Sequence, residues 1–253
     1  MHEDIARKAL SLLDLTDLTD TCDAAAIEKL CAQAQTPFGT TAAICIWPRF
    51  VSQARGILGK GHAVRIATVV NFPSGDLAVA GVVAETQQAI TDGADEIDLV
   101  IPYRAFLAGN GAAVTEMVAA VKAACPAPVI LKTILETGEI RDAALIRKAS
   151  DLAIAAGADF IKTSTGKVAV NATLPAAEIM LTAIKESGRP VGFKPAGGVR
   201  TVADAGQYLA LAASILGDGW ATPGTFRFGA SGLLGDILST LGGKAAPAAP
   251  ASY

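Results

Sequence analysis

Short apolar runs recur along the chain and alternate with segments whose apolar residues have helical spacing. Runs of about four to eight residues rich in valine, isoleucine and alanine are typical of strands buried on both faces of a sheet. Eight runs of this kind are predicted as strands: Ala42–Ile46, Val64–Val70, Asp95–Val100, Val129–Leu135, Ala158–Thr163, Pro190–Lys194, Ala213–Leu216 and Thr225–Gly229. Because they alternate with helical segments, the pattern predicts βαβ units and a parallel sheet.

The segments between these strands carry the 3.6-residue periodicity of amphipathic helices. Two apolar stripes are clear: Ile27, Leu30, Cys31 and Ala34, and then Leu145, Ile146, Ala149, Leu152, Ala153 and Ala156. Gly157 follows the second stripe and is a typical helix stop. Thr201, with Asp204 three residues later, predicts a capped helix N-terminus.

The number and order of these elements predict an α/β fold, the (β/α)8 or TIM barrel, which typically needs about 250 residues. The chain has 253. Apolar residues at helical spacing between Ile5 and Leu13 predict an extra N-terminal helix before the barrel. We expect residues 1–241 to form a single barrel domain, and the Ala/Pro-rich residues 242–253 to form a flexible tail that ends in Tyr253.

Composition and charge argue against several classes of partner. The chain has 21 Lys and Arg, 24 Asp and Glu, a net charge of −3 and no basic run, which argues against nucleic acid and anionic membrane surfaces. Hydrophobic residues make up 51% of the chain. Uninterrupted apolar runs nevertheless stop at about ten residues, short of the roughly 20 that span a bilayer. We therefore expect no membrane and no nucleic-acid partner.

The cysteines and histidines limit the compartment and the chemistry. The four cysteines lack CxxC spacing and are too few for a disulfide scaffold, and the acidic start is unlike a signal peptide, so we expect a cytoplasmic location. Zinc sites use several His or Cys ligands, and Ser-His-Asp catalysis needs a placed histidine. His2 and His62 meet neither requirement, so we expect chemistry without a metal and without histidine.

Four ionisable residues fall within or at the ends of predicted strands, where burial is costly. Lys132, Lys162 and Lys194 lie toward the carboxyl ends of three successive predicted strands, and Asp98 lies in the strand before them. The same Gly-Ala-Asp entry precedes the strands of Asp98 and Lys162, so these two residues occupy equivalent positions. Since the carboxyl ends of barrel strands form the active-site mouth, the pattern predicts three ammonium groups and a carboxylate gathered there.

This cluster suits Schiff-base chemistry. A lysine is a nucleophile only as the neutral amine, and at its usual pKa of about 10.4 only a few molecules in ten thousand are neutral at pH 7. A neighbouring cation and removal from water both lower that pKa. Two neighbouring lysines are therefore typical of a Schiff-base enzyme. A purely structural ion network among Asp98, Lys162 and Lys194 would explain the same residues equally well.

Glycine-rich segments follow three of the predicted strands. They are Thr165-Gly166-Lys167, Ala196-Gly197-Gly198-Val199-Arg200 and Gly229-Ala230-Ser231-Gly232. Glycine lets backbone N–H groups approach an anion, and Ser231 is placed to begin a helix whose N-terminus would favour negative charge. Barrels commonly bind phosphate with the loops after their last strands. The combination favours carbonyl chemistry on a small phosphorylated substrate.

Several segments of the chain resemble the signature segments of deoxyribose-phosphate aldolases. They are Asp95–Arg104, Ala158–Val168 and Val191–Arg200, with shorter ones at Asp14–Thr16, Ala42–Ile46, Ala67–Pro73 and Arg227–Ser231. The similarity extends from about Asp14 to Leu241. It implies a TIM-barrel class I aldolase without metal or cofactor that reversibly cleaves 2-deoxy-D-ribose 5-phosphate to D-glyceraldehyde 3-phosphate and acetaldehyde.

The resemblance also implies a role for each matching residue. Lys162 would form the Schiff base, Lys194 would be the neighbouring cation that lowers its pKa, and Asp98 would join a water-mediated proton relay. The tail would bring Tyr253 over the pocket to assist proton transfer. The implied substrate-binding residues, with Lys132 as part of the charge network, are Thr16, Cys45, Asn71, Lys132, Thr165, Gly166, Lys167, Gly197, Gly198, Gly229 and Ser231.

In one place the sequence departs from the family pattern. Gly232 stands where the phosphate loop often has a second serine, which removes one hydroxyl group from the implied phosphate site. Two other functions stay open on the residues alone: another Schiff-base barrel, such as a transaldolase-like or keto-acid aldolase, and a non-catalytic sugar-phosphate-binding barrel. The expected partners are small phosphorylated sugars and aldehydes, and the resemblance implies a homo-oligomer, a dimer.

Overall fold

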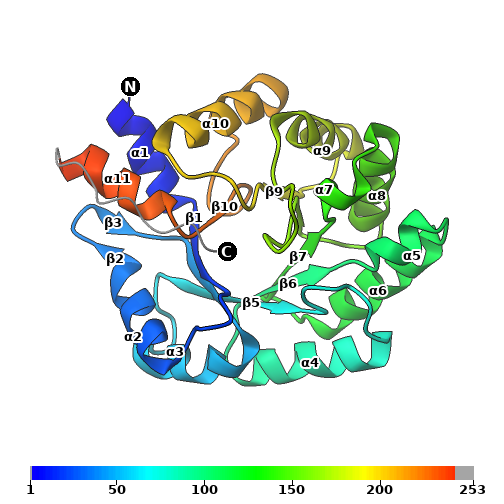
Figure 1. Ribbon diagram of the computed structural model, residues 1–253, viewed down its shortest axis with the longest axis horizontal. Coiled ribbons are helices and arrows are strands. Elements are labelled where there is room, and N and C mark those ends of the chain that lie inside the picture. The colour runs from blue at the N-terminus through cyan, green and yellow to red at the C-terminus, as the bar shows by residue number, and fades with distance from the viewer. Residues whose placement is uncertain (1, 243–253) are drawn as a thin grey trace.

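The computed structural model describes residues 2–242. Eight parallel strands form one sheet in the order β10-β1-β4-β5-β6-β7-β8-β9. Isolated parallel bridges, Phe193 to Phe226 and Ala196 to Gly229, join the two outer strands and bring the sheet to closure. Helices surround the strands on the outside (Figure 1). The predicted (β/α)8 barrel is therefore confirmed.

The barrel strands are short, and each lies within a few residues of a polar loop at its carboxyl end. Their bounds are β1 (Leu13–Asp17), β4 (Ala43–Ile46), β5 (Arg65–Val70), β6 (Glu96–Val100), β7 (Ile130–Ile134), β8 (Phe160–Lys162), β9 (Gly192–Lys194) and β10 (Phe228–Ala230). Seven of them overlap a strand predicted from the sequence, mostly with ends shifted by one or two residues.

One predicted strand is wrong, and one strand was not predicted. Ala213–Leu216 is the last turn of helix α10 (Val202–Leu216), whose alanine- and leucine-rich end resembles a buried strand in sequence. The strand that was not predicted is β1, whose Leu13 was assigned to the preceding helix. The sequence of β1 contains two aspartates, and a charged residue in a buried strand breaks the apolar pattern by which strands are found.

The helices occupy most of the connections. Their bounds are α1 (His2–Ser11), α2 (Ala24–Gln33), α3 (Val51–Leu58), α4 (Val79–Thr91), α5 (Tyr103–Leu107), α6 (Gly111–Ala124), α7 (Thr137–Ile140), α8 (Ala143–Ala155), α9 (Leu174–Ser187), α10 and α11 (Leu233–Gly242). A 3-10 helix (Pro48–Phe50) precedes α3, and β2 (Gln35–Thr36) pairs with β3 (Gly39–Thr40) outside the barrel. Within residues 2–242, no helix is both long and apolar enough to cross a membrane.

Local signals in the sequence explain where several of these helices begin and end. Thr201 and Asp204 form the predicted capping box at the start of α10, each side chain accepting from the other residue's backbone N–H. Gly157, after α8, adopts a φ of 105°, a conformation that favours glycine at a helix end. The N-terminal helix α1 is confirmed and lies beside α10 and α11 in the outer ring (Figure 1).

Close packing between β8 and β9 supports the strand ends that carry the chemistry. Gly192 is paired with Phe160, whose ring is buried, and a Cβ at Gly192 would lie 2.4 Å from a carbon of that ring. Overpacking of this kind typically costs about 1–3 kcal/mol. We therefore expect Gly192→Ala to lower the free energy of unfolding by that amount, measured by urea denaturation.

The matched control for this substitution is Gly56→Ala. Gly56 lies inside α3, where an added Cβ would meet nothing within 4 Å. Alanine is the better helix former, so this variant should be more stable by about 0.5–1 kcal/mol. An unchanged unfolding midpoint for Gly192→Ala would mean that the Phe160 ring has room to move, contrary to the packing described.

Candidate active site

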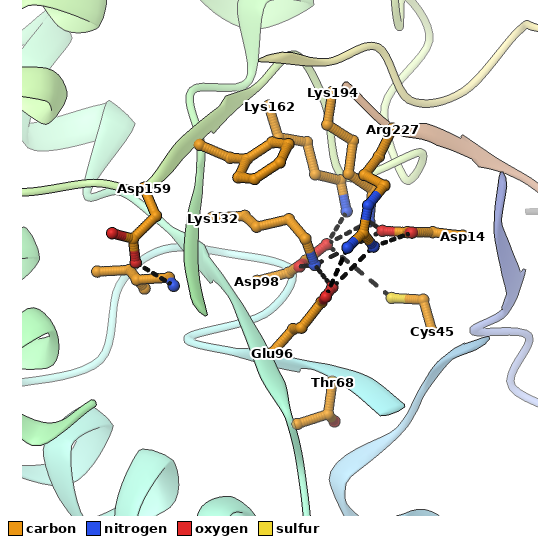
Figure 2. A network of polar contacts seen from close by, with 12 residues as sticks. Asp14, Cys45, Thr68, Glu96, Asp98, Lys132, Asp159, Lys162, Lys194 and Arg227 are labelled. Carbon is orange, nitrogen blue, oxygen red and sulfur yellow. Dashed lines mark hydrogen bonds and ion pairs between the residues drawn. The ribbon is translucent and has the colours of Figure 1, made fainter. Parts of the chain in front are cut away.

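The register of the parallel strands brings a set of charged side chains together inside the barrel (Figure 2). Glu96 and Asp98 are two residues apart on β6, and alternate residues of a strand share a face. In the sheet, Asp98 is paired with Lys132 of β7, and Lys162 of β8 is paired with Lys194 of β9. All five are buried.

Asp98 is the centre of this group. Its Oδ2 accepts hydrogen bonds from Lys162 Nζ and Lys194 Nζ, each at 2.8 Å, and its Oδ1 accepts one from Lys132 Nζ at 2.8 Å. Burial alone would raise the pKa of Asp98, but the three ammonium groups together hold it well below its usual range. One ionised carboxylate is therefore shared by three lysines.

Three further charged residues, which sequence reasoning did not assign to the site, complete the network. Asp14 of β1 contacts Lys194 at 2.5 Å, and Arg227 binds Asp14 at 2.7 Å. Glu96 accepts a hydrogen bond from Arg227 at 2.7 Å and forms an ion pair with Lys132 at 2.6 Å. Glu96 could have been found from the sequence, because it lies two residues before Asp98 in the same strand. The strand of Asp14 was missed, and Arg227 immediately precedes β10.

The charges of this network do not balance when every group is ionised. Four basic groups face three carboxylates, and all of them are buried. The acidic groups keep their charge, because the cations around them lower the pKa values of Asp14, Glu96 and Asp98 against the effect of burial. An unbalanced buried charge is costly, so one basic group is favoured in its neutral form.

Lys162 is the lysine whose surroundings favour the neutral amine. Burial lowers the pKa of Lys162, Asp98 opposes that effect, and the neighbouring Lys194 ammonium adds to it, so that the pKa is lowered overall. Lys132 and Lys194 are equally buried, but the pKa of each is raised because more than one carboxylate faces it. The site therefore holds one candidate nucleophile between fixed cations.

The glycine loops after β8, β9 and β10 lie at the carboxyl ends of neighbouring strands. The backbone φ values of Gly166, Gly197 and Gly198 are 84°, 76° and 88°. Glycine adopts such positive values more readily than any other residue. In the described part of the chain, no hydrogen bond uses the N–H of Gly166 or of Gly198. A Cβ at Gly229 would lie 2.8 Å from the Ala196 Cβ, so this glycine lets β10 approach the segment after β9.

Comparisons with known proteins show the family of the chain. A family model described as DeoC/LacD family aldolase matches residues 8–234. A curated deoxyribose-phosphate aldolase of Agrobacterium fabrum is 67% identical over 247 residues, which cover 97% of this chain and 95% of that protein. This chain belongs to the DeoC/LacD family of aldolases.

Solved structures give the same result. A Toxoplasma gondii ME49 protein, provisionally described as a deoxyribose-phosphate aldolase, has a TM-score of 0.88 and 25% identity, and the match covers 95% of each chain. A Coccidioides immitis protein with the same provisional description has a TM-score of 0.79 and 30% identity, covering 91% of this chain and 85% of its own. The chain is a lyase of the aldolase type.

Two residues of the loop after β8 already have partners within this aldolase. The Thr165 hydroxyl donates to Glu136 Oε2 at 2.5 Å, and its backbone N–H donates to Glu136 Oε1 at 3.0 Å. Lys167 extends toward the loop after β1, where its Nζ donates to the Leu18 carbonyl at 2.7 Å. Both residues lie at the mouth of the barrel, while Glu136 was not assigned a role from the sequence.

The other residues that the sequence suggested lie at different depths in the aldolase. Cys45 is buried with its Sγ 4.0 Å from Asp98 Oδ2, and burial raises the pKa of its thiol. The Thr16 hydroxyl donates to the Asp14 carbonyl. Asn71 lies in the turn after β5, where it donates to the Val100 carbonyl at 2.8 Å and accepts from a backbone N–H.

The last two suggested residues along the chain are Ser231 and Tyr253. Ser231 directly precedes Gly232 and α11, and it is half-buried. An added Cβ at Gly232 would meet nothing within 4 Å, so the serine of the family pattern would fit there. Tyr253 and the predicted tail beyond Gly242 lie outside the described residues.

Proposed function

We propose that this aldolase reversibly cleaves 2-deoxy-D-ribose 5-phosphate to D-glyceraldehyde 3-phosphate and acetaldehyde, with Lys162 as the Schiff-base residue. The single observation that carries the role of Lys162 is its place between Asp98 and Lys194, as the one lysine of three with a lowered pKa. The choice of substrate rests on the 67% identity to the Agrobacterium fabrum enzyme.

In the first step the neutral Lys162 amine attacks carbon 1 of the open-chain sugar. The carbonyl oxygen takes up protons and leaves as water, and a protonated imine remains between the enzyme and the substrate. Attack requires the lone pair of the amine, which is why the lowered pKa of Lys162 matters. Lys194 keeps its proton, because Asp14 and Asp98 raise its pKa.

In the second step the bond between carbons 2 and 3 breaks. A base removes the proton of the 3-hydroxyl group, that oxygen becomes the carbonyl of glyceraldehyde 3-phosphate, and the bonding electrons neutralise the imine as an enamine. Protonation of the enamine at carbon 2 and addition of water release acetaldehyde and restore the amine. Asp98 contacts both Lys162 and Lys194, and we assign it to a water-mediated proton relay beside the reacting atoms.

The phosphate of the substrate is proposed to bind in the loops after β8, β9 and β10. The N–H groups of Gly166 and Gly198, together with the N-terminus of α11 beside Ser231, suit an anion. Thr16, Cys45 and Asn71 remain proposed pocket residues, and Tyr253 a proposed proton-transfer residue. The proposed phosphate site agrees with the usual position in barrels, after the last strands.

The proposed setting is a cytoplasmic homo-oligomer that acts on small sugar phosphates and aldehydes. The four cysteines are unpaired and buried, which fits a reducing compartment. The homo-oligomer is supported by resemblance, and a related Aeropyrum pernix aldolase is described as tetrameric. Sedimentation of the purified protein measures this directly.

Borohydride reduction in the presence of acetaldehyde tests the proposed function. Reduction converts the imine into a stable ethyl-amine, which peptide mass spectrometry should find on the peptide that carries Lys162. An ethyl group on Lys194 instead, or no adduct at all, would overturn the proposal. Trapping with pyruvate but not with acetaldehyde would assign the chain to a keto-acid aldolase. A cleavage assay with 2-deoxyribose 5-phosphate, in which the acetaldehyde released is measured, completes the test.

A further inference from the structure

Glu136 is a buried carboxyl group that the proposed mechanism does not use. It comes two residues after the end of β7 and is fully buried. Its backbone has a φ of 61° and a ψ of 56°, in the left-handed region that glycine favours. A side chain in such a conformation costs about 1 kcal/mol or more and persists where the surroundings require it. A glutamate therefore occupies a position where glycine would be less strained.

The contacts of Glu136 lead to the proposed phosphate loop. Its two oxygens accept the backbone N–H and the hydroxyl of Thr165, at 3.0 and 2.5 Å. The Thr165 hydroxyl oxygen in turn accepts the backbone N–H of Lys167 at 3.0 Å. A continuous chain of hydrogen bonds thus runs from Glu136 through Thr165 to Lys167 and encloses Gly166.

This chain determines which donors of the loop remain for a ligand. The N–H groups of Thr165 and Lys167 are both occupied, whereas the N–H of Gly166 donates to no group in the described part of the chain. Gly166 has a φ of 84°, and its orientation depends on the two residues that Glu136 and Thr165 hold. Without the Glu136 contacts the turn would be free to redirect this N–H.

We propose that Glu136 is a positioning residue that holds the Thr165-Gly166-Lys167 turn in the shape that presents the Gly166 N–H to the substrate phosphate. This inference rests on the proposed function and adds the residue that shapes its phosphate site. A carboxylate suits the role because it offers two acceptor oxygens to two donors, and such charge-assisted bonds are short and strong. Burial raises the pKa of Glu136. The hydrogen bonds from Thr165 and the charge of Lys162 lower it, but the effect of burial is larger.

Glu136→Gln tests the proposal, because the amide keeps the shape and one acceptor but turns a donor toward the Thr165 hydroxyl. We expect the KM for 2-deoxyribose 5-phosphate to rise about tenfold, with kcat changed by less than about twofold. For unphosphorylated 2-deoxyribose, kcat/KM should stay within about twofold of the wild type. Competitive inhibition by inorganic phosphate should weaken about as much as KM rises.

Thr165→Val and Thr165→Ser provide a second test that does not depend on the folding of the Glu136 variant. Valine removes the hydroxyl and should reproduce the rise in KM, whereas serine keeps the hydroxyl and should raise KM for the phosphorylated sugar much less than valine does. The double variant Glu136→Gln/Thr165→Val should be no worse than either single variant, because both act through one chain of hydrogen bonds. Independent, additive losses would contradict the proposal.

The matched control is Glu139→Gln, the same substitution on α7 at a half-buried side chain with no contact to the loop among the hydrogen bonds described. It should leave unchanged the KM for 2-deoxyribose 5-phosphate, the kcat/KM for 2-deoxyribose and the inhibition by inorganic phosphate. Equal losses on the phosphorylated and the unphosphorylated sugar in Glu136→Gln, or no loss on either, would overturn the inference. Failure of the wild type to cleave 2-deoxyribose 5-phosphate would defeat the proposed function instead, so the two failures are distinguishable.

Discussion

Replacing Lys162 with methionine should lower kcat for aldol cleavage by at least about 10⁴-fold and leave the barrel folded. The loss is large because removing the nucleophile of a covalent mechanism removes the whole pathway, not one contact. Methionine fills a similar apolar volume, and Asp98 keeps its hydrogen bonds from Lys132 and Lys194. Turnover measured with a coupled assay for glyceraldehyde 3-phosphate gives the rate, and borohydride trapping should find no adduct.

The same variant should be more stable than the wild type at neutral pH. The pKa of Lys162 is lowered in the folded protein from the ordinary value of 10.5, so the folded state binds fewer protons than the unfolded state between those two values. Stability contributed by this residue therefore rises with pH through that window. The advantage of Lys162→Met should be largest near pH 7 and should shrink as the pH approaches the ordinary lysine pKa of 10.5.

Urea unfolding of both proteins from pH 7 to pH 10 measures this difference. Lys148→Met, at an exposed position on α8, is the control for replacing a lysine by methionine, and its difference from the wild type should not follow the same course. A Lys162→Met protein that is less stable at pH 7, or an advantage that grows with pH, would show that the buried ammonium stabilises the fold.

The fold was predictable because most of its strands lie in short, mainly apolar runs between helical segments. Parallel barrel strands are covered by helices outside and by side chains inside, so Ala43–Ile46 and Arg65–Val70 stand out as apolar runs. The strand Leu13–Asp17 did not stand out, because it carries Asp14 into the barrel interior. The wrong strand at Ala213–Leu216 and the missed strand at Leu13–Asp17 have one cause, which is that both were judged by apolar pattern alone. That pattern does not distinguish a strand with charged residues from a loop, or an apolar helix end from a strand.

The candidate site was predictable where repeats set the register. The shared Gly-Ala-Asp entry gave Asp98 and Lys162 equivalent positions, and their atoms lie 2.8 Å apart. Contacts between distant segments left no such signal: Arg227 reaches Glu96 across 131 positions of the chain. Thr165 was correctly placed in the loop, but its polar atoms are directed to Glu136, and only coordinates show the direction of a side chain.

Removing the cation beside the nucleophile should have the second largest effect. In Lys194→Met, the value of kcat/KM at pH 7 should fall by at least about 100-fold, and the acid limb of the pH profile should move to higher pH. The Lys194 ammonium lowers the pKa of Lys162, so its loss raises that pKa. A higher pKa leaves less of the neutral amine at pH 7, and the rate of attack falls with it. Activity should therefore recover in part as the pH rises from 7 to 10.

The charge balance of the network explains why this substitution is so costly to the reaction. Without Lys194, the three carboxylates Asp14, Glu96 and Asp98 face Lys132, Lys162 and Arg227, and the buried charges balance only when Lys162 is protonated. In the wild type, the additional cation makes the neutral Lys162 the balanced state. Lys194 thus shifts the amine toward its reactive form by completing the neutralisation of the carboxylates.

Lys122→Met is the control for this prediction. Lys122 contacts Asp159 at 2.6 Å and is about one-third exposed, so its replacement removes an ion-paired lysine outside the catalytic network. Its pH profile should match the wild type. A Lys194→Met enzyme that loses activity while its acid limb stays in place would mean that Lys194 acts on carbon–carbon cleavage instead of on the ionisation of Lys162. The shape of the profile, more than its height, therefore decides the role of the second lysine.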